Sequence, residues 1–85
     1  MAIYRYRPAV LEELTAHGVR PLPHTRPELV RDYVHDLYKF EIRRLRDRMR
    51  RHEFSNAEYA GHVDALRRRY PVLALMPSEF VEPDR

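Results

Sequence analysis

The sequence predicts an all-α fold in which a long helix and a shorter helix form an antiparallel hairpin. Two stretches, about 26–52 and about 56–70, repeat apolar residues at spacings of three and four, which is the period of an α-helix. Only about three residues separate them, and so short a link favours neighbouring helices of opposite direction. A short N-terminal helix and an apolar, extended C-terminal tail complete a single small domain over residues 1–85.

The amino-acid composition excludes several classes of protein and of functional site. The chain has 85 residues, of which 44% are apolar and 34% charged, a mixture too apolar for a disordered chain. It lacks the uninterrupted run of about 18 apolar residues that a membrane span needs. It has no cysteine, which excludes disulfides, thiolate metal sites and a cysteine nucleophile. Its start lacks the apolar segment of a secretory signal, so we expect a cytoplasmic protein.

The short N-terminal helix is predicted between Pro8 and Gly18. Proline is favoured at the first position of a helix and glycine just after the last, and this segment has both. Val10, Leu11 and Leu14 are spaced to form one apolar face. Because three turns are marginally stable alone, we expect this helix to dock on the rest of the chain.

The two longer helices have local start and stop signals. Thr25 and Glu28 fit a capping box at the start of the long helix, and Ser55 and Glu58 repeat the pattern before the next one. Pro71 ends that second helix. The apolar stretch that follows, 71–77, is bracketed by prolines and is expected to lie extended over a groove between helices, while residues 78–85 should add a short turn or fray.

The long helix carries two apolar lines. One comprises Val34, Tyr38, Ile42, Leu45 and Met49, and the other comprises Leu29, Tyr33, Leu37 and Phe40. The following helix has one narrow line, made of Tyr59, Val63, Leu66 and Tyr70, which can cover the first of these. The second line must be covered by the short helix, by the tail, or by another chain.

The strongest charge signal is an arginine-rich segment. Residues 43–51 contain six arginines and one aspartate, a local charge of +5 within a chain whose net charge is +3. One interpretation is a solvated helical face, and the other is contact with nucleic-acid phosphates. The candidate nucleic-acid-binding residues are Arg43, Arg46, Arg50, Arg67, Arg68 and Arg69. In an antiparallel hairpin the last three should lie near the start of the long helix, far from Arg50.

Catalytic and metal sites have little support in the sequence. Glu41 falls between the two apolar lines, and we expect Arg44, Arg48 or a tyrosine hydroxyl to meet its carboxylate. The five histidines form no metal-binding motif, and Ser55 is already assigned to a helix cap. We therefore expect no enzyme activity, no cofactor and no metal.

Two functional hypotheses follow. The first is a noncatalytic protein–protein interaction or assembly module, expected as a homodimer that pairs through Leu29, Tyr33, Leu37 and Phe40, since interfaces favour tyrosine and arginine together. The alternative is a nonspecific RNA- or DNA-binding protein that uses the segment 43–51.

Overall fold

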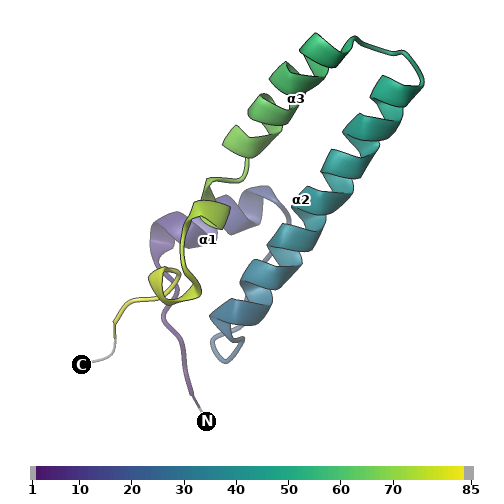
Figure 1. Ribbon diagram of the computed structural model, residues 1–85. Helices are drawn as coiled ribbons and strands as arrows, with labels where there is room; N and C mark the ends of the chain where they lie inside the picture. Colours follow the sequence, from purple (N-terminus) through teal and green to yellow (C-terminus); the bar gives the residue numbers. More distant parts are fainter. Residues whose placement is uncertain (1, 84–85) are drawn as a thin grey trace.

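The structure, a computed structural model, describes residues 2–83 and is all-α, as the sequence predicts. Its elements are α1 (Pro8–Ala16), α2 (Pro27–Arg50), α3 (Asn56–Arg68) and two 3-10 turns, η1 (Pro71–Ala74) and η2 (Pro77–Glu79). Figure 1 shows α2 and α3 as a long hairpin, with α1 and the two 3-10 turns gathered at its open end. Met1 and residues 84–85 of the expected domain lie outside the described residues.

The short N-terminal helix is confirmed, with its predicted end signals. Pro8 occupies the first turn of α1, where its missing N–H costs no helical hydrogen bond. Gly18 follows the helix with a φ of +75°, a left-handed conformation that favours glycine. The N–H groups of His17 and Gly18 donate to carbonyls of the last turn, which closes the helix end.

The start of α2 differs from the prediction. The helix begins at Pro27 with Arg26 as its N-cap, so the predicted capping box between Thr25 and Glu28 is wrong. The Thr25 hydroxyl instead accepts a hydrogen bond of 3.0 Å from the N–H of Leu22, which fixes the turn before the helix. Proline fits the first helical position well, and this moves the helix start past the reach of Thr25.

The capping box of α3 is confirmed. The N–H of Glu58 donates to the Ser55 hydroxyl at 3.2 Å, and the Ser55 N–H donates back to the Glu58 carboxylate at 3.2 Å. These bonds satisfy amides that the first turn of a helix leaves without partners.

The hairpin makes an elongated molecule of 52 × 17 × 17 Å. α3 returns alongside α2 after the turn at its far end (Figure 1). Phe54, just before α3, packs against the Arg48 guanidinium, whereas Tyr70, just after α3, packs against Tyr38 near the middle of α2. The contacts therefore occur in opposite order along the two helices. In the described residues no helix is long and apolar enough to cross a membrane.

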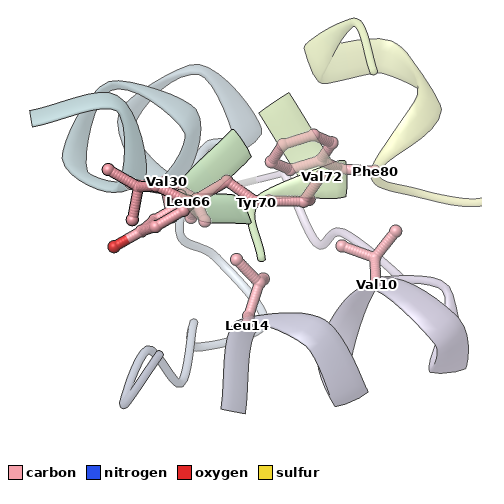
Figure 2. Packing of buried hydrophobic residues seen from close by; sticks show 8 residues of the cluster. Val10, Leu14, Val30, Leu66, Tyr70, Val72 and Phe80 are labelled. Carbon is pink, nitrogen blue, oxygen red and sulfur yellow. The ribbon is translucent and has the colours of Figure 1, made fainter. Parts of the chain in front are cut away.

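The hydrophobic core lies at the open end of the hairpin. α1, α2, α3, η1 and Phe80 after η2 contribute to it (Figure 2), and its fully or nearly fully buried members are Val10, Leu14, Val30, Val34, Leu66, Tyr70, Val72 and Phe80. The far half of the hairpin is held by half-buried side chains such as Ile42 and Leu45. Burial is thus concentrated where α1 and the tail cross α2 and α3.

The C-terminal tail is more ordered than predicted. Instead of lying extended, it winds through η1 and η2 and buries Val72 and Phe80 completely. The short turn expected after residue 77 is present as η2, but residues 80–83 do not fray. The Arg7 N–H donates to the Phe80 carbonyl at 2.9 Å, and Tyr6 forms an isolated antiparallel bridge with Val81. These contacts with the N-terminal segment therefore hold the tail against the core.

Candidate interaction surface on α2

One side of α2 exposes a row of large apolar side chains. Leu29, Tyr33 and Phe40 are 56%, 57% and 54% exposed, and Leu37 is half-buried at the edge of the core. At about 100° per residue, Leu29, Tyr33 and Phe40 lie within roughly 40° of one another around the helix axis. We call these four residues the α2 stripe. Asp36 lies on the same side between Tyr33 and Phe40, where it pairs with Lys39 at 3.5 Å. Scattered single apolar residues are common on protein surfaces, whereas several large ones on one side of a helix indicate a contact site.

The other apolar side of α2 is covered by the chain itself. Val30 and Val34 are 4% and 0% exposed and belong to the core that α2 shares with α1, the end of α3 and the tail. Val30 belongs to this covered side, although the sequence analysis placed it on neither line. The helix thus has two apolar sides, and within residues 2–83 only one of them is packed.

The α2 stripe is bounded along the helix by charge. From Leu29 to Phe40 it extends about 17 Å at 1.5 Å per residue. The positions that continue the same line past Phe40 are Arg44 and Asp47, and the Arg44 guanidinium lies 6.0 Å from the centre of the Phe40 ring. The apolar surface is therefore confined to the first half of α2.

The two halves of α2 also differ in net charge. Residues 27–40 carry three acidic and two basic side chains, a net charge of −1, whereas residues 41–50 carry two acidic and five basic side chains, a net charge of +3. The first half of the helix is therefore apolar and nearly neutral on balance, and the second half is strongly basic.

The predicted arginine sites form two groups that do not join. Arg69 approaches Glu41 at 3.9 Å and so lies beside the middle of α2, not near its start as predicted, while Arg68 pairs with Asp64 of its own helix at 3.5 Å. The remaining candidates make no ion pair or side-chain hydrogen bond within residues 2–83, namely Arg43, Arg46, Arg50 and Arg67. Arg50 ends α2 at the far turn, so the expected separation from the α3 group is present.

The far turn holds a compact charge cluster. Arg48 and Arg51 both donate to the Glu53 carboxylate at 3.1 Å, and these hydrogen bonds hold the pKa of Glu53 below its ordinary value. Two arginines of the 43–51 segment therefore share one carboxylate within the chain. The other four arginines of the segment make no ion pair within residues 2–83, namely Arg43, Arg44, Arg46 and Arg50.

The partner of Glu41 is a tyrosine hydroxyl, one of the three partners predicted. Tyr70 donates its O–H to Glu41, and Arg69 rather than Arg44 or Arg48 supplies the nearby positive charge. Burial and this hydrogen bond raise the pKa of Tyr70 to about 12. His17 stacks on the Tyr70 ring with centroids 4.0 Å apart, a contact that has no signal in the sequence because 53 positions separate the two residues. This carboxylate therefore has a structural role.

The histidines of the described chain are dispersed. Residues 2–83 contain no group of three or more His, Asp or Glu side chains close enough to hold a metal ion. His62 packs on Phe54, with centroids 4.4 Å apart, and so is engaged within α3 and its turn.

Comparison with protein-family models, curated proteins and solved structures finds no match to this chain.

Proposed function

We propose that this protein is a noncatalytic interaction module that associates with a second copy of itself through the α2 stripe. The observation that supports this most directly is the row of Leu29, Tyr33 and Phe40, each more than half exposed along one side of a helix. A second copy is a suitable occupant because a symmetric dimer places the same apolar row on both sides of the contact.

The area of the stripe predicts a weak dimer. Aromatic side chains bury about 150–250 Å² when fully covered, so three half-exposed residues contribute about 300 Å² per copy. A stable dimer buries about 800 Å² per partner, so the stripe supplies less than half of that. Two copies would gain about 15 kcal/mol at about 25 cal/mol per Å². Association costs about 4–15 kcal/mol. At the middle of that range, about 10 kcal/mol, the remaining gain of about 5 kcal/mol corresponds to a dissociation constant of about 0.2 mM.

Charge favours a dimer in which the two α2 helices run in opposite directions. Pairing in the same direction would place the +3 halves, residues 41–50, side by side. Like charges in contact are destabilising, and this arrangement brings ten arginines together. Reversed pairing overlaps the two apolar halves, with Leu29 of one copy near Phe40 of the other, and directs the basic halves away from each other.

Cysteine cross-linking tests both association and direction, because the chain has no cysteine of its own. Arg26 and Arg44 are exposed, flank the stripe on the same side, and are separated by about 27 Å along the helix, too far to bridge within one chain. In the reversed dimer Arg26 of one copy faces Arg44 of the other. Mixing Arg26→Cys with Arg44→Cys should therefore give a covalent dimer under mild oxidation, whereas each variant alone should not.

The matched control is Glu12→Cys, an exposed position on α1 that lies outside α2. Mixed with either variant, it should give only background cross-linking. Covalent dimers from Arg26→Cys alone and Arg44→Cys alone would show pairing in the same direction and would contradict the charge argument. Equal, slow cross-linking in every mixture would show random collision and would contradict the proposed interface.

A second candidate function is nonspecific binding to RNA or DNA, and one observation favours it. Arg43, Arg46 and Arg50 share one ridge of α2, are exposed, and have no acidic partner within residues 2–83. Free arginines in a row can neutralise backbone phosphates without reading the bases. Arg67 adds a further free charge, but it lies beside Arg31, His35 and Tyr38 of α2, away from Arg50 at the far turn.

Salt dependence separates this candidate from self-association. Binding of a fluorescent single-stranded oligonucleotide should weaken steeply with salt, with a slope of log K against log salt of about −2 for three neutralised phosphates. The triple substitution of Arg43, Arg46 and Arg50 by glutamine should abolish binding, while Tyr33→Asp should leave it unchanged. No binding at low salt, or binding that the triple variant retains, would remove this candidate.

A further inference from the structure

We propose that a cavity on the other side of α2 binds a small organic carboxylate with an apolar body. The cavity has a volume of about 360 Å³ and lies between α2, the end of α3 and η1. At about 100° per residue its α2 residues lie roughly half a turn around the helix from the α2 stripe. Its lining residues are Arg31, His35, Tyr38, Arg67, Tyr70, Pro71, Leu73 and Ala74.

The positive side chains of this cavity have no acidic counterpart. Arg31 and Arg67 make no ion pair within residues 2–83, and no aspartate or glutamate is among the residues that line the described cavity. Arg31 is half-buried, and its hydrogen bonds go to neutral backbone carbonyls, so no negative charge balances its guanidinium within residues 2–83. Charge complementarity therefore points to an anion as the occupant.

Arg31 is held in a fixed position and still has donors available. Its Nε donates to the carbonyl of Leu75 at 3.1 Å, and its Nη2 donates to the carbonyl of Leu73 at 3.0 Å. A guanidinium has five N–H donors, so these two bonds leave three. One N–H of Nη1 and the remaining N–H of Nη2 can then present two parallel donors, the geometry that matches the two oxygens of a carboxylate.

The rest of the cavity is apolar, and it therefore favours a ligand whose body is apolar. Tyr38, Tyr70, Pro71, Leu73 and Ala74 supply most of its walls. The Tyr70 ring is fixed by its stack on His17, its edge contact with Tyr38 and its hydrogen bond to Glu41. A rigid aromatic wall beside fixed donors loses little entropy on binding. A volume of this size is at the lower end of the range for small-molecule sites, about 300–1,000 Å³.

The test uses naphthalene-2-carboxylate as the probe and follows the amide NMR signals of the ¹⁵N-labelled protein. We expect saturable shifts centred on Arg31 and residues 71–75, with submillimolar affinity. Naphthalene-2-carboxamide, which keeps the ring but has no charge, should bind about tenfold more weakly. Acetate, which keeps the charge without the ring, should give no saturation over the same range.

Variants identify the residues responsible. Arg67→Gln should weaken the probe about three- to fivefold, as expected for one exposed charge, and should leave the fold intact because this side chain has no partner within residues 2–83. Arg68→Gln is the matched control, because Arg68 lies outside the cavity and should have no effect. Arg31→Met should lose at least about tenfold, with circular dichroism to verify folding, because its head group also holds the tail.

Three results would overturn the proposal: equal binding of the carboxylate and the carboxamide, equal effects of Arg67→Gln and Arg68→Gln, or shifts that fall outside the cavity or do not saturate. Tyr33→Asp, which removes an apolar residue of the stripe on the opposite side of α2, should bind the probe as the original chain does. Loss of self-association and loss of the carboxylate site are therefore distinguishable.

Discussion

Replacing Phe80 by alanine should remove a large fraction of the stability of this protein. Phe80 is 0% exposed and is the largest of the fully buried side chains. Removing a buried phenyl ring costs about 3–5 kcal/mol, through lost transfer free energy and the cavity left behind. A domain of this length has a free energy of unfolding of about 4–13 kcal/mol, at about 0.05–0.15 kcal/mol per residue.

Phe40→Ala is the matched control, because the same chemical change is made at a side chain that is 54% exposed. Here the expected loss is under about 1 kcal/mol, since half-exposed surface positions leave little cavity. Urea denaturation followed by far-ultraviolet circular dichroism, at low micromolar protein so that self-association adds nothing, gives both values. Similar costs for the two substitutions, or a cost below about 1 kcal/mol for Phe80→Ala, would refute the placement of the core under the tail.

Two further predictions concern the local structure. Ser55→Ala should destabilise the protein by about 1 kcal/mol, because it removes the capping box of α3. Thr25→Ala should cost less, because the Thr25 hydroxyl does not cap α2. Urea denaturation measures both losses of stability, and equal losses would contradict the assignment of the caps. Burial raises the pKa of the Tyr6 and Tyr70 phenols from 10.0 to about 12. The charge on Glu28 adds to the effect at Tyr6, and the hydrogen bond to Glu41 adds to it at Tyr70. The folded state therefore retains these protons more strongly, so their stabilising contribution is complete below about pH 10 and disappears as the pH rises through about 12. An ultraviolet titration of tyrosinate, compared with Tyr70→Phe, should show two late-titrating tyrosines in the original chain and one in the variant; normal titration of both would contradict it.

The features that the sequence predicted well depend on residues close together in the chain. Pro8, Pro27 and Pro71 mark helix boundaries, because a proline fits a first turn and cannot continue a helix. The Ser55 cap depends only on residues in the first turn of α3. The apolar spacing of α2 likewise predicted a second apolar line, of which Leu29, Tyr33 and Phe40 are exposed in the structure.

What sequence reasoning missed depends on contacts between distant segments. Phe80 is buried because the N-terminal segment bridges to Val81, and nothing near Phe80 in the sequence indicates that pairing. The capping box predicted at Thr25 is absent because Thr25 and Pro27 both signal a helix start, and α2 begins at Pro27. The cavity beside Arg31 was also missed, because its walls come from α2, α3 and η1, and its basic residues fit no local motif.

Sedimentation equilibrium over a concentration series, comparing the original chain with Tyr33→Asp, tests self-association most directly. α2 has two apolar sides, and the described residues cover only one of them. We predict that the original chain shifts from monomer to dimer between micromolar and millimolar concentration. Tyr33→Asp should stay monomeric with an unchanged circular dichroism spectrum. An original chain that remains monomeric up to millimolar concentration would contradict the claim that the α2 stripe is a self-association surface.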